Sequence, residues 1–325
     1  MTYRLPAEWE PQEAIQLTWP HNGTDWKPVI QEVTQCYINI AREIAKREKL
    51  WIITPEPQKV ERLLRNHLDP NSLARITYYR IPTNDTWARD HSFITLLPTH
   101  TNPAHPHQGR CLLDFRFNAW GGKYEATLDN AINKQHYAIN PSLSQDTYED
   151  HLDFELEGGS IESDGQGTIL TTAQCNLNPN RRIDPSHVEA ELKRRLHAQR
   201  ILWLHHGSLE QDDTDAHVDT LARLCPNDTI IYSQGFPAML SELQTMRTPQ
   251  GKPYHLVSVP QYYANFLIMN KAILLPYYAD PTANEQARQT IASVFPDREV
   301  IGIDCQILLT QNGSLHCCTM QYPRI

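Results

Sequence analysis

Short runs of branched and aromatic residues recur along the whole chain, and this recurrence most constrains how the chain can fold. Runs of this composition are typical of β-strands. The clearest lie at residues 50–54, 76–81, 111–115, 168–172, 200–204, 229–232, 271–276 and 299–303. Between them lie amphipathic segments with apolar side chains at helical spacing, at residues 28–47, 185–198 and 281–294. Alternating strands and helices predict an α/β protein.

The spacing of these segments is even over all 325 residues, and no linker or shift in composition divides the chain. Length alone allows one large repeat-built domain or two ordinary ones. The even spacing favours a single catalytic domain that covers residues 1–325. About five strand-and-helix units of roughly 65 residues would fill this length, and such a period suggests a closed, propeller-like array.

Composition narrows the function. The formal net charge of -9 and the lack of a Lys/Arg cluster argue against a nucleic-acid partner and fit a small cationic substrate. No apolar stretch is long enough for a signal peptide or a membrane span, so we expect a cytoplasmic protein. The seven cysteines are odd in number and scattered, which predicts free thiols, most of them packed in the core.

The pentapeptide Asp-Ala-His-Val-Asp at residues 215–219 is the first candidate for chemistry. In an extended segment, residues two apart point to the same face, so His217 and at least one carboxylate would line one pocket. The alternatives are a solvated acidic loop and a histidine satisfied in the core.

A second polar cluster, Asn-Asp-Thr-Trp-Ala-Arg-Asp at residues 84–90, follows the apolar run at residues 76–81. The end of a strand is where α/β proteins tend to bind ligands. The same residues are also ordinary turn formers, and Arg89 with Asp90 is compatible with a surface ion pair.

Glycines mark the third and fourth candidates. Glu-Gly-Gly-Ser at residues 157–160 precedes a glycine-rich turn and the run at residues 168–172, which predicts a hairpin with a close backbone approach. It is not a phosphate loop, because no Gly-Lys-Ser/Thr and no helix follow. Asn-Gly-Ser-Leu-His-Cys-Cys at residues 312–318 predicts a turn and a short strand, with a thiol that is either reactive or structural.

Taken together, these segments resemble the agmatine deiminase and bacterial peptidylarginine deiminase family throughout the chain. The matching motifs occur in order at residues 6–11, 17–20, 84–90, 117–122, 157–159, 214–219, 265–266, 295–298 and 316–317. The resemblance implies the pentein fold of the guanidine-modifying superfamily, a five-bladed, pseudo-symmetric α/β propeller with its site at the centre. It also implies that the enzyme needs no cofactor or metal and that it forms a dimer.

The resemblance also implies residue roles. Asp90 and Asp219 match the family's guanidinium-binding aspartates, and carboxylates in the plane of a guanidinium suit its forked N–H donors. Cys317 matches the nucleophile, whose thiolate would form a thiouronium adduct that water can hydrolyse. His217 would protonate the departing ammonia and then take a proton from water. Glu157 would accept a hydrogen bond from the other imidazole nitrogen.

Other positions have two interpretations. Trp87 and Trp120 either stack on the guanidinium or pack in the core. Cys318 competes with Cys317, because adjacent strand residues point to opposite faces and one of the two faces the pocket. The family's His-Cys pairing selects Cys317.

The expected reaction converts agmatine to N-carbamoylputrescine and ammonia in diamine metabolism. Carboxylates just before the pentapeptide, Glu210, Asp212 and Asp213, would attract the ammonium of agmatine and repel the α-carboxylate of arginine. The alternative is a solvated acidic loop. Asp90 is followed by His-Ser-Phe where agmatine deiminases commonly have Thr-Gly-Pro, and Gln-Asn-Gly-Ser at residues 311–314 replaces a glycine-rich run. These departures leave peptidyl or free arginine open as the substrate.

Two rival hypotheses come from other classes. A metal-dependent amidohydrolase would use His205, His206, His217 and nearby carboxylates to hold zinc or manganese and activate water. A non-catalytic protein that binds guanidines would capture the ligand without forming a thiol adduct.

Overall fold

The computed structural model describes residues 3–99, 109–210 and 212–325. Its strands are β1 (Tyr3–Arg4), β2 (Gln12–Thr18), β3 (Lys49–Thr54), β4 (Ile76–Arg80), β5 (Ile94–Pro98), β6 (Cys111–Arg116), β7 (Thr147–Glu155), β8 (Ile161–Ser163), β9 (Thr168–Thr172), β10 (Arg200–Leu204), β11 (Ala222–Cys225), β12 (Thr229–Ser233), β13 (His255–Val259), β14 (Leu267–Met269), β15 (Ala272–Tyr277), β16 (Glu299–Asp304) and β17 (Thr319–Pro323). Its α-helices are α1 (Ile30–Ala45), α2 (Pro57–Arg65), α3 (Pro70–Leu73), α4 (Ala88–His91), α5 (Ala119–Gly122), α6 (Ile132–Ile139), α7 (Ala173–Asn176), α8 (Pro185–Arg195), α9 (Pro237–Thr245) and α10 (Pro281–Val294).

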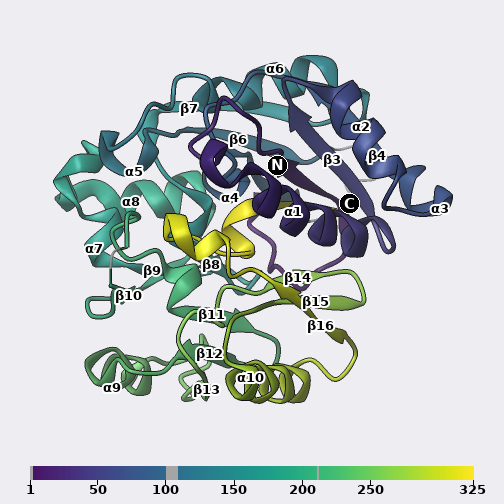
Figure 1. Cartoon of the computed structure of the whole chain (residues 1–325). Coiled ribbons are helices and arrows are strands. Elements are labelled where there is room, and N and C mark those ends of the chain that lie inside the picture. Colours follow the sequence, from purple (N-terminus) through teal and green to yellow (C-terminus); the bar gives the residue numbers. More distant parts are fainter. Residues whose placement is uncertain (1–2, 100–108, 211) are drawn as a thin grey trace.

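Within the described residues the strands form five sheets that share one plan. In each sheet a first strand runs antiparallel to a second, and the second runs parallel to a third. The triplets are β17-β2-β3, β5-β6-β7, β8-β9-β10, β11-β12-β13 and β14-β15-β16. Helices connect the second strand to the third, as a parallel pair requires, and Figure 1 shows α6, α8, α9 and α10 of these helices at the outer edge of the molecule.

The five-bladed α/β propeller is therefore confirmed, and the strands predicted from branched and aromatic runs and the helices predicted from apolar spacing are present. The predicted helix at residues 281–294 is α10, which begins at Pro281 after the capping residue Asp280. The carboxylate of Asp280 accepts from the backbone N of Thr282 at 2.8 Å. Asp184 caps α8 in the same way. An acidic cap followed by proline is a strong signal for a helix start, which is why these boundaries could be read from sequence.

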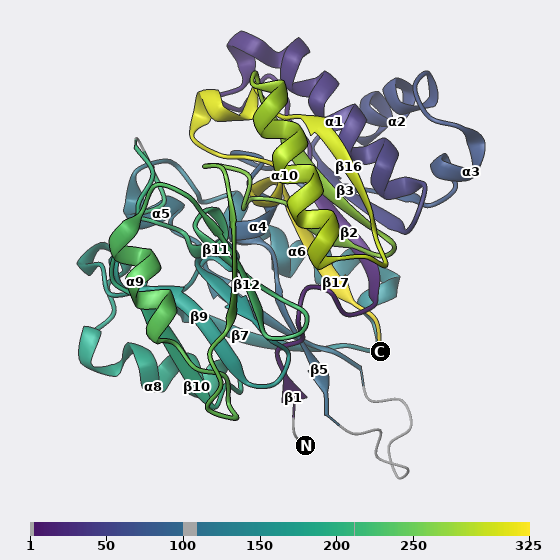
Figure 2. The same ribbon diagram turned by 90° about the horizontal axis from the view of Figure 1, so that it is seen from below.

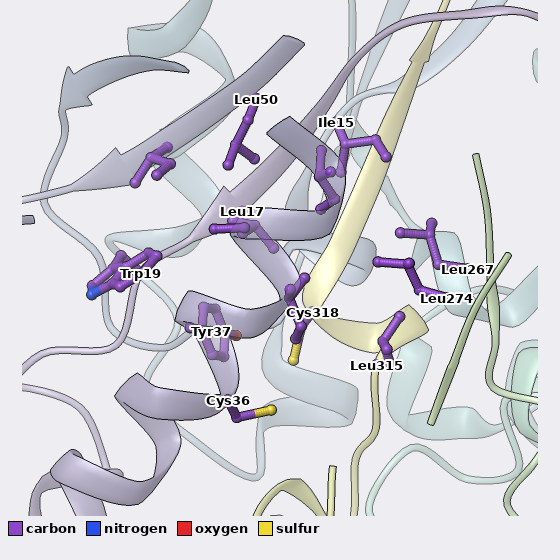
Figure 3. Packing of buried hydrophobic residues seen from close by; sticks show 14 of the residues in the cluster. Ile15, Leu17, Trp19, Cys36, Tyr37, Leu50, Leu267, Leu274, Leu315 and Cys318 are labelled. Carbon is purple, nitrogen blue, oxygen red and sulfur yellow. The ribbon is translucent and has the colours of Figure 1, made fainter. Parts of the chain in front are cut away.

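Strand β17 closes the ring, because it pairs with β2 from the other end of the chain. Thr319 lies opposite Leu17 in this antiparallel ladder, and Figure 2 shows the two strands side by side. The largest hydrophobic cluster packs against this sheet and α1, and it includes Leu17, Tyr37 and Cys318 (Figure 3). The closure fixes the segment that precedes β17, where Cys317 lies.

The cysteine prediction also holds, since all seven cysteines are free and buried. In the described part of the chain, we find no helix that combines the length and the apolar character needed to cross a bilayer.

Candidate active site

The first strand of every sheet is preceded by a short segment that bears a polar or thiol side chain. These segments are α4 before β5, the 3-10 turn Gly158–Ser160 before β8, Val218–Thr220 before β11, Asn265 before β14, and His316–Cys318 before β17. Helix α4 contacts the turns before β8 and β17, and the turn before β8 contacts the turn before β11. The five repeats thus bring these segments to one place.

Asp90 and Gly159 lie at the centre of the site where these segments meet. Oδ1 of Asp90 accepts from the backbone N of Gly159 at 3.0 Å, and Oδ2 accepts from Nε1 of Trp120 at 3.0 Å. A Cβ on Gly159 would lie 2.7 Å from Oδ1 of Asp90, 2.7 Å from Nδ1 of His217 and 3.1 Å from Oδ2 of Asp219. Only glycine allows these three groups to come so close. Burial raises the pKa of Asp90 to about 6.

His217 lies between two carboxylates. Its Nδ1 is 3.6 Å from Oδ1 of Asp90, and its Nε2 is 3.8 Å from Oε2 of Glu157. Burial lowers the pKa of His217, but the charges of Asp90 and Cys175 and the carboxylate of Glu157 together raise it well above its usual value. The imidazole is therefore set up to carry a proton.

Glu157 differs in part from its expected role. It lies beside the imidazole, but its closest partner is Arg181, whose Nε lies 2.9 Å from Oε1. Burial raises the pKa of Glu157, and Arg181 and His217 lower it further than burial raises it. Arg181 also donates to Sγ of Cys175 at 3.4 Å. Sequence reasoning missed Arg181 and Cys175, because neither lies in a recognisable motif.

Cys317 lies beside Asp219 and Asn265. Its Sγ is 3.4 Å from Oδ1 of Asn265 and 3.9 Å from Oδ2 of Asp219. Burial, followed by the charges of Asp219 and Asp90, raises the pKa of the Cys317 thiol well above its usual value. The raised pKa favours the protonated form of this thiol.

The prediction that residues 215–219 are extended is wrong. Asp215 and Ala216 adopt left-handed φ angles of 63° and 69°, and a 3-10 turn follows. The carboxylate of Asp215 is drawn away by Nζ of Lys123 at 2.9 Å and Nη1 of Arg181 at 2.7 Å. His217 and Asp219 still converge, because the turn rather than strand alternation directs them inward.

The strand assumed at Cys317 and Cys318 is also wrong. Both belong to the 3-10 turn His316–Cys318, and β17 begins after it. With three residues per turn, adjacent side chains point about 120° apart. Cys317 lines a cavity, whereas Cys318 packs in the cluster with Cys36 and Tyr37 (Figure 3).

The cavity in front of Cys317 has a volume of about 200 Å³. It is lined by Asp25, Asp85, Trp87, Asp90, Trp120, Tyr124, Asp213, Thr214, Thr220, Thr310, Gln311, Asn312, Gly313 and Cys317. Among these described lining residues there is no Lys or Arg. Burial raises the pKa of Asp85 to about 7. Its carboxyl group therefore becomes negatively charged as the pH rises through neutrality. His217, Glu157 and Asp219 lie one layer deeper.

The acidic loop before the pentapeptide reaches the cavity at one residue. Asp213 lines it, and Oδ2 of Asp213 accepts from the hydroxyl of Tyr124 at 3.0 Å and from Nδ2 of Asn312 at 2.9 Å. The prediction was wrong for Asp212, whose carboxylate accepts from backbone groups of its own loop. Glu210 is exposed and lies outside the lining.

Trp87 and Trp120 both line the cavity, and each donates a hydrogen bond from its indole N–H to a carboxylate. Trp120 donates to Asp90, and Trp87 donates to Oδ2 of Asp85 at 3.1 Å. The ring of Trp87 packs so closely on Gly313 that a Cβ there would lie 2.2 Å from it. Their contacts in the structure are therefore hydrogen bonds to carboxylates and packing.

Two groups of described side chains are close enough to share a metal ion: Glu157, Cys175 and His217, and Glu8, Glu162 and His316. Each group already contains a guanidinium, from Arg181 in the first and from Arg223 in the second. His205 and His206 are exposed, and His206 pairs with Glu242 at 2.7 Å. The histidines of the amidohydrolase hypothesis are therefore not assembled around His217.

Comparison with known proteins first identifies the fold class. A mutant DDAH from Pseudomonas aeruginosa in complex with citrulline is 11% identical and superimposes with a TM-score of 0.56, over 96% of this chain and 100% of its own. That likeness supports the pentein fold alone.

Closer comparisons identify the family. The model of the Porphyromonas-type peptidyl-arginine deiminases matches residues 4–323. A structure described as a "Putative Arginine Deiminase" from Porphyromonas gingivalis is 40% identical, with a TM-score of 0.89 and 99% of each chain covered. A C. jejuni agmatine deiminase with substrate bound is 29% identical, with a TM-score of 0.87 and 99% and 97% coverage. A "Putative agmatine deiminase" of Shewanella frigidimarina is 29% identical over 99% of this chain and 94% of its own length. The chain belongs to the Porphyromonas-type peptidyl-arginine deiminase family.

Proposed function

We propose that this protein is a cysteine hydrolase that deiminates a small guanidine, with agmatine as its preferred substrate. The products would be N-carbamoylputrescine and ammonia. The observation that carries this proposal is the placement of the Cys317 thiol beside Asp219, in an acid-lined cavity that also contains Asp90. A planar cation between two carboxylates would present its carbon to the thiol.

Binding of the substrate would also activate the nucleophile. The pKa of the Cys317 thiol is raised by burial and by the two aspartates, so a guanidinium held by Asp90 and Asp219 would oppose that effect. The thiol proton is then released, and the thiolate adds to the guanidinium carbon. This order protects the thiol from reaction while the cavity lacks a cation.

His217 would perform the proton transfers. As the carbon–nitrogen bond breaks, the imidazolium donates its proton and ammonia leaves, which gives a thiouronium bound to Cys317. Water then adds to the same carbon and returns a proton to His217. Breaking of the carbon–sulfur bond, with transfer of the adduct's hydroxyl proton to the sulfur, releases the ureido product and restores the thiol. Glu157 and its partner Arg181 would orient the ring throughout.

The charges around the cavity favour agmatine over free arginine. The wall carries Asp25, Asp85 and Asp213, which would attract the ammonium of agmatine. An α-carboxylate would lie beside these acids, and the nearby cation Lys123 is already bound to Asp215 and to the backbone O of Asp213. An unpaired carboxylate in such a site is costly.

Deimination of free or peptidyl arginine is the second candidate. The family name and the relative from Porphyromonas gingivalis favour it. The deciding experiment measures ammonia release from agmatine, arginine, peptidylarginine and dimethylarginine, each with the unmodified protein and with Cys317→Ala. Our proposal predicts the highest kcat/KM with agmatine and no release from any substrate by the variant.

A covalent adduct distinguishes catalysis from simple binding. Rapid quenching during turnover, followed by mass spectrometry, should find the adduct on the peptide that contains Cys317. Binding of agmatine without an adduct and without ammonia would support the non-catalytic hypothesis. A cytoplasmic location and a homodimer stay predictions.

A further inference from the structure

His316, the residue before Cys317, is held by carboxylates on both sides of its ring. Its Nδ1 lies 2.7 Å from Oδ2 of Asp219, and its Nε2 lies 2.7 Å from Oε2 of Glu8. The residue is 1% exposed. An ionised carboxylate only accepts hydrogen bonds, so two charged carboxylates require a proton on both ring nitrogens. Carboxylate oxygens at both ring nitrogens are the arrangement that suits an imidazolium.

Glu8 is kept charged by a buried guanidinium. Nη2 of Arg223 lies 2.8 Å from Oε2 of Glu8, and the backbone N of Ile268 donates to Oε1 at 2.8 Å. Burial raises the pKa of Glu8, but Arg223 and His316 bring it well below its usual range. Nη2 of Arg223 also lies 3.1 Å from Nε2 of His316, and both atoms contact the same oxygen, Oε2 of Glu8. Glu8 therefore acts as the counter-ion of the imidazolium.

Asp219 has one oxygen engaged and one open. His316 binds Oδ2, whereas Oδ1 is buried and has no hydrogen-bond partner among the residues that the structure describes. Burial raises the pKa of Asp219, and the hydrogen bond and charge of His316 lower it further than burial raises it. The engaged oxygen, Oδ2, lies 3.9 Å from Sγ of Cys317, and a charged carboxylate whose other oxygen is open suits a guanidinium N–H donor.

We propose that His316 is a positioning residue for guanidinium recognition, whose imidazolium, anchored by Glu8, holds Asp219 ionised and oriented toward the substrate. This inference rests on the proposed function and deepens it, because it adds a layer of residues that contacts no substrate. The charged or titratable groups around this relay are Glu8, Arg223, Glu162, Arg89, Asp219, His217, Asp90 and Cys317.

Two substitutions by amide residues test the contact with Asp219 and the contact with Glu8 separately. His316→Asn keeps an N–H donor near the position of Nδ1, toward Asp219, and His316→Gln keeps one near Nε2, toward Glu8. Neither amide carries a charge. We expect kcat/KM for agmatine to fall at least tenfold in His316→Gln, mainly through KM, and to fall less in His316→Asn.

The pH profile adds a measurement that a merely structural role would not change. Without the neighbouring cation, Asp219 takes up a proton at higher pH. This adds a second protonation to the one expected at Asp90, so the acid limb of kcat/KM should become steeper and move to higher pH in both variants. Equal losses in the two variants with an unmoved acid limb would overturn the inference.

Glu8→Gln tests the relay without altering the turn that bears the nucleophile. It should move the acid limb in the same direction by a smaller amount. Glu10→Gln is the matched control, because the carboxylate of Glu10 binds Arg4 and the backbone N of Ala7 rather than His316. If Glu8→Gln behaves like Glu10→Gln, the relay does not act on Asp219.

A further measurement does not depend on turnover. In protein with nitrogen-15 histidine, the ring signals of His316, assigned by their absence in His316→Asn, should show two protonated nitrogens at pH 7. A neutral ring would contradict the proposal. If the protein released no ammonia from any guanidine, the proposed function would fail, and the relay would be judged by calorimetric binding of agmatine to the same variants. Unchanged affinity would then reject it.

Discussion

Gly159→Ala should damage activity far more than stability. The new Cβ would lie 2.7 Å from Oδ1 of Asp90 and from Nδ1 of His217, and 3.1 Å from Oδ2 of Asp219. Nonbonded carbon contacts are best at roughly 3.5–4.0 Å, so these groups must move apart by several tenths of an ångström. Displacing reacting groups by about 1 Å costs about 10²-fold in rate. We expect kcat/KM for ammonia release to fall by about that factor.

The free energy of unfolding of Gly159→Ala should fall only modestly, because overpacking by one methyl group typically costs about 1–3 kcal/mol. Gly251→Ala is the control. Gly251 has a φ of +81° and nothing within 4 Å of an added Cβ, so alanine there strains the backbone without touching the site. It should lower Tm in a thermal scan and leave kcat/KM within about twofold. If kcat/KM of Gly159→Ala stays within threefold of that of the unmodified protein, Gly159 is not packed tightly against Asp90 and His217.

Other predictions follow from the same geometry. Cys317→Ala should abolish ammonia release, whereas Cys318→Ala should lower Tm and keep most of the activity; equal loss of activity would remove Cys317 as nucleophile. The pKa of Asp90 is raised to about 6, so kcat/KM should fall as pH drops through about 6 and Asp90 becomes neutral. Since a bound guanidinium favours the carboxylate, the acid limb of kcat should lie at lower pH, and coincident limbs would contradict this. Asp213→Asn should reduce the ratio of kcat/KM for agmatine to that for arginine, and an unchanged ratio would reject its role. Chelators should leave activity unchanged, and a loss restored by zinc or manganese would favour the metal hypothesis.

Sequence reasoning located elements whose signals are local. Helices with an acidic cap and a proline, such as α8 and α10, and strands rich in β-branched and apolar residues, such as β9 and β15, needed no tertiary information. Strand β2 was missed because it carries Gln12 and Gln16, which look like surface residues. Both are buried, and Gln16 accepts from the hydroxyl of Tyr322 at 2.8 Å and donates to Ser92 at 2.8 Å. Such a pairing between the ends of the chain leaves no local pattern.

The site could be predicted residue by residue but not in its geometry. The motifs indicated Asp90, His217 and Cys317, and the structure places Asp90 and Cys317 in the wall of one cavity and His217 directly behind Asp90. The conformations that bring them there depend on distant partners, as when Arg181 and Lys123 draw Asp215 outward and force the turn before His217. No spacing in the sequence specifies such contacts.

The repeat explains why the site needs the whole ring. In each sheet a short turn or loop comes directly before the first strand. The candidate residues lie in these turns and loops rather than in the strands. Strands alternate their side chains between two faces, whereas a turn at the start of a strand can direct consecutive polar groups toward the axis. Because the last turn is held by the pairing of β17 with β2, the position of Cys317 depends on closure of the propeller. The packing of Cys318 with Tyr37 in the adjoining core then fixes the rotation of that turn, so Cys318 helps to direct the thiol of Cys317 toward the cavity.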